Sequence, residues 1–414
     1  MSIPVQVTGA WLMHHDQKLS AVKSTEFESI TTAGRAARLL SYISKEEQWS
    51  VPLTRVQALA QANGIRKHEV AGLLTELSNV GVVDETSHGV AVLGVNQDHL
   101  FKHAATVFEE QEPTGLERAA LELAELASQL PVEEVSTAER LSDEHRLSKA
   151  ETADLTSLSK QIGFVDHEAL RDKTLLFNGS LFKRDDARKS QIILDGLNAT
   201  ERQNLLETDA RLAATGCLPE DTIVGILGTA LWSKLHQIGY YQVSLVTNEN
   251  GSTRFVTRPA ALVKYVPGGL ADMHDDAKAL ASSLTYGILK SSKERGKIQD
   301  PAVLMNVLIN RGYVEGWARA IKEDYQALER RGVVTVSSSS DGFRLTLQKP
   351  EIGTMAQDLI LRGDASEAAA RATIGSQAGK FVGPEGARMA ERLKDVPETK
   401  RSASLALDSL RKAR

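Results

Sequence analysis

The chain has 414 residues, of which 42% are hydrophobic and 25% charged, and this composition is ordinary for a soluble globular protein. Its 49 Lys and Arg against 54 Asp and Glu give a net charge of −5, which excludes a uniformly basic nucleic-acid coat protein but permits a local basic face. The single cysteine, Cys217, excludes an internal disulfide and a cysteine zinc site, so we expect a cytoplasmic location. No apolar run approaches the roughly 18 residues of a membrane span, and Met1–Gln6 does not resemble a signal peptide.

The first predicted elements lie between residues 5 and 80. Val5–Ala21 is interpreted as a β-hairpin. Apolar residues at helical spacing then predict helices over Phe27–Ile43, Leu53–Ala62 and Arg66–Val80, with a turn at Asn63–Gly64 before the third helix.

A distinctive pattern ends this third helix. Leu73, Leu74 and Leu77 form an apolar stripe, Gly81 follows, and two adjacent valines come directly after it. Glycine adopts the left-handed conformation that ends many helices, and the valine pair begins a strand. The pattern therefore predicts a helix followed by a hairpin.

The same pattern occurs three more times, at intervals too long for a solenoid repeat. The corresponding glycines are Gly163, Gly239 and Gly332. Each copy is followed by a turn signal between apolar runs; these signals are His88–Gly89, Asn178–Gly179, Asn250–Gly251 and Asp341–Gly342. The second copy has one leucine out of register, and the third has only one clear helix, Asn198–Ala214, before Pro219. The fourth has helices predicted at 276–291, 301–310 and 316–331.

Three helices with a glycine-containing turn before the third, followed by a hairpin, resemble the winged helix-turn-helix domain. The resemblance implies a mainly α chain with small β-hairpins (α+β), built from tandem winged helix-turn-helix units. The expected domains are an N-terminal hairpin with the first winged helix (1–96), linker helices with the second (97–182), the third (183–265), the fourth (266–350), and an Ala/Gly-rich basic tail (351–414).

Winged helices commonly bind DNA, and the third helix of a helix-turn-helix enters the major groove. Clustered cations around the first, third and fourth copies are therefore candidate contacts to double-stranded DNA. These nucleic-acid-binding candidates are Arg66, Lys67, His68, Arg254, Arg258, Lys293, Arg295, Lys297, Arg319, Lys322, Arg330 and Arg344. Arg66 and His68 are the candidates for base reading because they open the third helix of the first copy.

The middle copies carry acidic residues where phosphate readers need cations. Glu220 and Asp221 open the presumed recognition helix of the third copy, so we expect the second and third copies to face protein rather than DNA. No sequence motif for a metal, phosphate loop, dinucleotide or nucleophile elbow is present, so we expect neither catalysis nor a cofactor.

The sequence therefore favours a non-enzymatic DNA-binding protein, either a transcription regulator or a DNA-recognition subunit of a larger complex. Residues 379–414 hold nine Lys and Arg against five Asp and Glu, and are expected to form a mobile basic arm that aids binding. The alternative, which the net negative charge favours, is a winged-helix scaffold that assembles partner proteins without binding DNA, as in chromosome-organising or defence complexes. A protein partner or homo-oligomer is expected in either case.

Overall fold

The computed structural model describes residues 3–20, 22, 25–46, 48, 50–86, 89–93, 99–265, 271–340 and 342–376. The chain divides into two compact bodies, an N-terminal body of residues 1–179 with 374–414 and a C-terminal body of residues 180–373. Mixed helices and small antiparallel sheets make up both bodies, in agreement with the expected α+β class. Within these described ranges no helix has the length and apolar character needed to span a bilayer.

The hairpin predicted at the N-terminus is wrong, because Val5–Leu19 forms helix α1. This helix packs against α2 (Glu28–Ile43) and α5 (Leu100–Glu110). Nearly every residue from Gly9 to Asp16 is buried, so α1 lacks the apolar stripe that identifies a helix with one solvent face. Gly9 and Gly34 permit the close packing, since a Cβ on either would lie within 2.6 Å of a backbone carbonyl oxygen.

The first repeat follows α1 and contains the three predicted helices. Its elements are α2 (Glu28–Ile43), β1 (Ser50–Val51), α3 (Leu53–Ala62), α4 (Val70–Asn79), β2 (Val83–Thr86) and β3 (Gly89–Val92). The strands form an antiparallel sheet in the order β1-β3-β2. His88, part of the predicted turn, lies outside the described residues.

The second repeat has the same order of elements. They are α6 (Gly115–Gln129), β4 (Val132–Glu133), α7 (Glu134–His145), α8 (Lys149–Ile162), β5 (Asp166–Leu170) and β6 (Lys173–Phe177). The hairpin turns at Arg171 and Asp172 rather than at Asn178–Gly179, and Arg171 has a positive φ of 56°. Asn178 instead donates its backbone N–H to the carbonyl of Ala127 at 2.9 Å, so it follows the last strand of the sheet.

The third repeat begins the C-terminal body after α9 (Arg184–Asp195). Its elements are α10 (Ala199–Thr215), β7 (Cys217–Pro219), α11 (Glu220–Leu227), α12 (Thr229–Gln237), β8 (Gln242–Asn248) and β9 (Gly251–Thr257). The sequence pattern predicts α10 and the apolar stripe of α12 before Gly239, but it places Glu220 and Asp221 in that same helix, because α11 and α12 are separated only by the single residue Gly228. A one-turn helix, α13 (Ala260–Val263), follows the hairpin.

The fourth repeat differs from the predicted set of three long helices. After α14 (Ala271–Leu289) its elements are α15 (Pro301–Arg311), β10 (Tyr313–Gly316), α16 (Arg319–Glu323), α17 (Gln326–Arg330), β11 (Val334–Ser339) and β12 (Gly342–Leu347). The helix predicted at 316–331 is thus two short helices, and a strand precedes them. Asp341 of the predicted turn lies outside the described residues.

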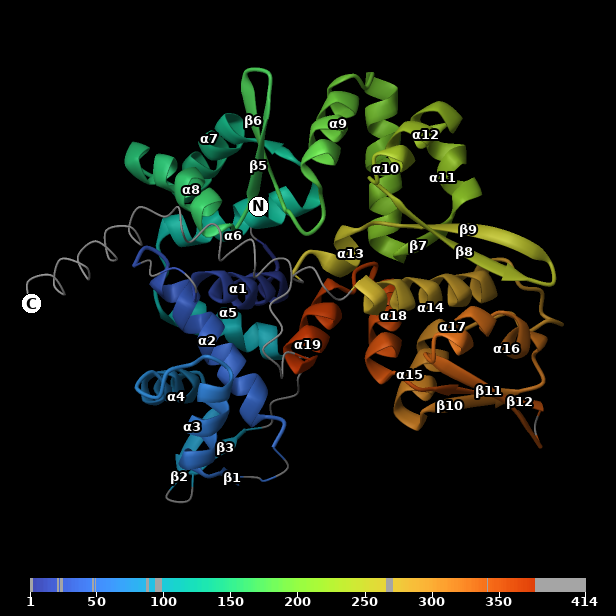
Figure 1. Ribbon diagram of the computed structural model, residues 1–414, viewed down its shortest axis with the longest axis horizontal. Helices are drawn as coiled ribbons and strands as arrows, with labels where there is room; N and C mark the ends of the chain where they lie inside the picture. Colours follow the sequence, from blue (N-terminus) through green and yellow to red (C-terminus); the bar gives the residue numbers. More distant parts are fainter. Residues whose placement is uncertain are drawn as a thin grey trace, which may run out of the picture. The chain divides into compact units, whose positions relative to one another are not determined.

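The segment expected to begin a mobile tail is helical as far as residue 376, and its described side chains are packed as far as Ala370. Helices α18 (Pro350–Arg362) and α19 (Ser366–Ser376) follow the last strand. Ile352, Met355 and Leu359 of α18 are fully buried in one core with α14, α15 and the β11–β12 hairpin. In Figure 1, α14 and α18 lie side by side above the fourth repeat. The expected basic arm at 379–414 lies outside the described residues.

The four repeats therefore share one order of elements: helix, strand, helix, helix, strand, strand. In each sheet the third strand lies between the first and second, and all pairings are antiparallel. Gly81, Gly163, Gly239 and Gly332 each have a φ between 67° and 85° and come just after the end of a helix. The prediction that these glycines stand between a helix and a hairpin is confirmed.

Candidate nucleic-acid interface

The basic residues of the first repeat lie in the turn before α4 rather than inside the helix. Arg66, Lys67 and His68 are all exposed, and α4 begins only at Val70. The turn is fixed by Glu69, whose carboxylate accepts the backbone N–H of Arg66 at 2.8 Å and pairs with Arg35. The predicted extension of the helix to residue 66 is wrong because this carboxylate closes a separate turn.

The exposed side of α4 is uncharged apart from one acidic residue. It presents the small or neutral residues Ala71, Gly72, Thr75, Ser78 and Asn79. Glu76 is half-buried, and its carboxylate accepts a hydrogen bond from the side chain of Gln111 at 2.8 Å. The three basic side chains thus stand at the beginning of a helix face that offers little repulsion to a polyanion.

In the third repeat, the acidic pair lies on a different helix from the one expected. Glu220 and Asp221 begin α11, the second helix of the repeat. Glu220 accepts a hydrogen bond from Trp232 Nε1 at 2.9 Å and pairs with Arg254 at 2.9 Å. Asp221 pairs with Lys290 at 2.7 Å. Both carboxylates are therefore neutralised within the chain.

Helix α12 occupies the position expected of a recognition helix, and its exposed face has no acidic side chain. The exposed residues are Thr229, Ala230, Ser233, Lys234 and Gln237. Arg254 on strand β9 lies beside this helix, with Nη2 at 3.2 Å from the imidazole of His236. Sequence reasoning missed this face because it took Glu220 and Asp221 as part of the recognition helix.

The two predicted arginines of the third repeat have separate environments. Arg254 is exposed and pairs with Glu220, whereas Arg258 follows the end of β9 and is half-buried. The positive charge of Arg258 acts on Asp209, which accepts hydrogen bonds from the hydroxyls of Tyr240 and Tyr241 at 2.9 and 2.8 Å. Both were predicted as contacts to DNA, but only Arg254 lies on the strand, because β9 ends at Thr257.

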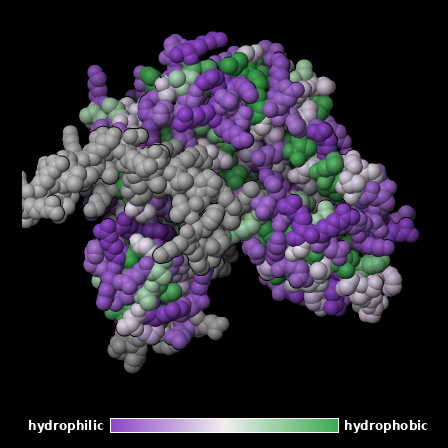
Figure 2. All heavy atoms as spheres, in the orientation of Figure 1, coloured by the Kyte–Doolittle hydropathy of each residue, from purple (hydrophilic) through white to green (hydrophobic). Residues whose placement is uncertain are grey.

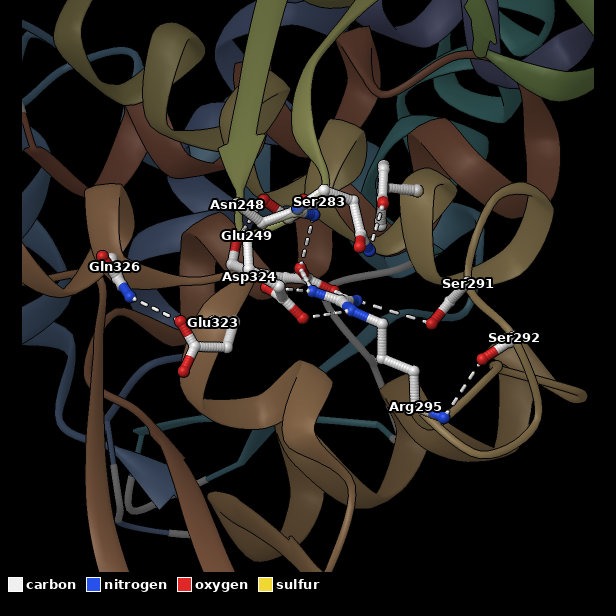
Figure 3. Close-up of polar contacts among 11 residues, drawn as sticks. Asn248, Glu249, Ser283, Ser291, Ser292, Arg295, Glu323, Asp324 and Gln326 are labelled. Atoms are coloured by element: carbon white, nitrogen blue, oxygen red, sulfur yellow. Dashed lines mark hydrogen bonds and ion pairs between the residues drawn. The ribbon is translucent and has the colours of Figure 1, made fainter.

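Arg295 is buried, which removes it from the predicted DNA-contacting set. Its side chain is 9% exposed and contacts two carboxylates, those of Asp324 on the α16–α17 connection and Glu249 at the tip of the β8–β9 hairpin. Nη1 and Nη2 donate to Asp324 at 2.7 and 2.5 Å, and Nε and Nη2 donate to Glu249 at 2.7 and 2.9 Å. Figure 3 shows the guanidinium between these acidic groups.

We call Arg295, Asp324, Glu249 and Asn248 the Arg295 cluster. Asn248 Nδ2 donates to Asp324 at 2.9 Å, which adds a second link between the β8–β9 hairpin and the fourth repeat (Figure 3). Nearby, Asn250 Nδ2 donates to the hydroxyl of Tyr286 at 3.3 Å. The hairpin of the third repeat is thus fixed to the fourth repeat by polar contacts at its tip.

Other basic residues of the same loop remain exposed. Lys293 and Lys297 flank Arg295 and have exposed side chains, and Arg319 is exposed at the start of α16. The loop lies against α16, because Ala320 donates its backbone N–H to the carbonyl of Arg295 at 3.1 Å. Within the described residues, none of the three exposed cations forms an ion pair.

A hollow of about 360 Å³ lies between the short helices and the hairpin of the fourth repeat. Its lining combines two cations, an amide, a carboxylate, two hydroxyls and two apolar side chains; the residues are Lys322, Gln326, Glu329, Arg330, Val336, Ser337, Ser338 and Phe343. Glu329 accepts the backbone N–H of Val336 at 3.0 Å. Lys322 and Arg330 are exposed and, in the described part of the chain, make no ion pair.

The guanidinium of Arg344 already has partners within the chain, and a DNA phosphate would have to compete with them. On strand β12 it lies opposite Glu315 of β10, and its Nε donates to that carboxylate at 2.6 Å. Its guanidinium also lies over the ring of Tyr313, 4.4 Å from the centroid. The side chain is 43% exposed, so one edge still faces solvent.

Among the described residues, no group of three or more His, Cys, Asp or Glu side chains is arranged to hold a metal ion. Cys217 is buried, and burial raises the pKa of its thiol to about 11, so the thiolate nucleophile is scarce at neutral pH. Burial also lowers the pKa of His14 and His15 well below the ordinary histidine value.

Comparison of the chain with protein-family models, with curated proteins and with solved structures finds no match.

Proposed function

We propose that the chain is a non-enzymatic DNA-binding protein built from four winged-helix units. The support for this fold is the fourfold order of elements together with the strand order first-third-second, which is the arrangement of a helix-turn-helix followed by a two-stranded wing. The first, third and fourth repeats provide the proposed contacts, as a regulator or as the DNA-recognition subunit of a larger complex. The buried lone thiol fits the reducing cytoplasm that we propose as its location.

The observation that carries the proposal is the basic hollow of the fourth repeat. Lys322 and Arg330 have no carboxylate partner among the described residues, although Glu329 lies in the same hollow. Glu329 is engaged by a backbone N–H, whereas the hydroxyls of Ser337 and Ser338 offer further donors to phosphate oxygens. Unpaired cations beside hydroxyl donors suit a phosphate backbone better than an apolar partner surface.

The third repeat strengthens the proposal and changes the expected set of contacts. Helix α12 presents small polar residues with Lys234, and the acidic groups beside it are paired internally. Thr, Ser and Gln side chains on such a face can reach base edges or phosphates in a major groove. We therefore add α12 to the proposed interface and remove Arg295.

The test is the affinity for a labelled 30-base-pair duplex of random sequence, measured by fluorescence anisotropy across a salt series. Each phosphate neutralised contributes about 0.9 to the slope of log affinity against log salt. The variant Lys322→Ala with Arg330→Ala should reduce this slope by up to about 1.8 and weaken binding at every salt concentration.

The matched control removes two exposed cations from α9 and α10, Lys189→Ala with Arg202→Ala, and should leave the slope unchanged. Equal effects of the two double variants would indicate only a general charge effect and contradict a specific interface. Absence of duplex binding by the unmodified protein would favour the scaffold that assembles partner proteins.

A further inference from the structure

Trp317 is the most exposed of the large hydrophobic side chains in the described structure, with 77% of its surface accessible. Trp11 and Trp232, by contrast, are buried, and each donates its indole N–H to a glutamate. Burying an indole ring is among the larger apolar contributions to folding, so an exposed ring forgoes this stabilisation. The exposed ring is therefore available for a contact outside the fold.

The backbone that carries Trp317 is tightly held. The residue directly follows strand β10, and the glycine of the β11–β12 turn packs on it: a Cβ on Gly342 would lie 2.9 Å from the Trp317 Cα. On the other side, Ala318 contacts Gly296 so closely that a Cβ on that glycine would lie 2.4 Å from the Ala318 Cβ. The ring therefore projects from a fixed position rather than from a loose loop.

Two exposed cations lie on the segments next to Trp317. Arg319 and Lys297 are exposed on the two segments that meet at Ala318, and neither forms an ion pair among the described residues. The nearest strand carboxylate, Glu315, is paired with Arg344. Figure 2 shows many hydrophilic side chains on the visible surface of the fourth repeat. In the described segments next to Trp317, residues 290–299 and 313–320, no other large hydrophobic side chain is exposed, so these segments form no large apolar patch. The surface around the indole therefore offers little area to a protein partner that would bind it through apolar contacts alone.

An exposed aromatic ring beside cations matches the chemistry of single-stranded nucleic-acid binding. Bases stack on the ring in a sequence-tolerant way, and the cations neutralise the flanking phosphates. From this arrangement we propose that Trp317 stacks on an unpaired base, with Lys297 and Arg319 holding the adjacent backbone. The inference rests on the proposed DNA binding and adds unpaired DNA, as a single strand or an open duplex end, to the ligands of the fourth repeat.

The test compares Trp317→Ala and Trp317→Phe in the full-length protein on a 20-nucleotide single strand and on a closed duplex hairpin of equal charge, in which non-nucleotide linkers join the strands at both ends so that every base is paired. The alanine variant should bind the single strand about 5- to 150-fold more weakly, and the phenylalanine variant should recover most of the affinity. Binding to the closed hairpin should be unchanged by either variant, because its bases are paired. Quenching of Trp317 emission by the single strand is measured in a Trp49→Phe background, because the other two tryptophans, Trp11 and Trp232, are buried.

The outcomes separate this inference from the proposed function. Stacking is refuted if Trp317→Ala leaves the affinity for the single strand unchanged and the single strand does not quench Trp317 emission. Duplex binding still stands in that case if Lys322→Ala with Arg330→Ala lowers the salt slope for the duplex. If the unmodified protein binds neither nucleic acid, both proposals fail. Equal weakening on the single strand and the closed hairpin would also overturn stacking, because it would indicate a contact that does not require an unpaired base.

Discussion

The substitution Arg295→Met should strongly destabilise the contact between the third and fourth repeats. Methionine keeps the apolar stem but removes the charge, and it leaves the Asp324 side chain, which is 1% exposed, without a cationic partner. Removing one member of a buried ion pair costs about 3–5 kcal/mol because the remaining charge stays buried. The contribution of Glu249 is smaller, since that side chain is 42% exposed and its carboxylate can be hydrated.

Hydrogen exchange of the full-length protein measures this effect locally. Peptides covering the β8–β9 hairpin and the α16–α17 connection should exchange at least about 100-fold faster in the variant, as a loss of about 3 kcal/mol implies. The control is Lys290→Met, which breaks the exposed pair with Asp221, where the side chains are 37% and 66% exposed. Such exposed pairs contribute about 0–1 kcal/mol, so this control should change exchange little.

A second variant distinguishes loss of the ion pair from loss of packing. Arg295→Met combined with Asp324→Leu removes both buried charges and should recover much of the protection lost in the single variant. Equal exchange in Arg295→Met and Lys290→Met would refute the argument that the Arg295 cluster holds the β8–β9 hairpin.

Three further outcomes follow from other parts of the molecule. Burial lowers the pKa of His14 and His15 and keeps both neutral in the folded state, whereas in the unfolded chain they take up protons below the ordinary histidine pKa of about 6.5. The free energy of unfolding of the N-terminal body should therefore fall between pH 7.5 and pH 5.5. The urea midpoint measured across this range should show the loss, and His15→Gln should make the midpoint less dependent on pH. Gly363→Ala should lower the temperature of thermal unfolding more than Gly312→Ala does. Both glycines have a positive φ, which costs about 1–2 kcal/mol of stability for alanine. Only at Gly363 would the added Cβ also lie 1.8 Å from a backbone carbonyl oxygen of α10. Lys234→Ala should weaken duplex binding and lower the salt slope by about 0.9, and an unchanged slope would exclude α12 from the interface.

The sequence predicts the part of the fold that depends on local patterns. A glycine after an apolar stripe often ends a helix, and Gly81 with its three counterparts identifies the four junctions between helix and hairpin. The strands at Ser50–Val51 and Val132–Glu133 were missed because two residues carry no periodic signal. Helix α1 was misread because residues buried on every side give no contrast between faces.

The candidate site was less predictable because it depends on partners far apart in the chain. Arg295 looked like a surface cation, yet its carboxylates come from residues 29 positions later and 46 positions earlier. The basic hollow needs α16, α17 and the hairpin to meet, which no local window of sequence reveals. The boundary between α11 and α12 could have been placed at Gly228, since a glycine between two short apolar runs separates the second and third helices of the repeat.

The burial of the Arg295 cluster has a consequence for any measurement made in concentrated salt. Mobile ions screen charges that they can approach, and they have little access to a carboxylate that is 1% exposed. Raising the ionic strength should therefore weaken contacts with a phosphate backbone while the third and fourth repeats stay joined. A salt titration of this protein would then report on its outer charges alone, with the spacing between the two repeats held constant throughout.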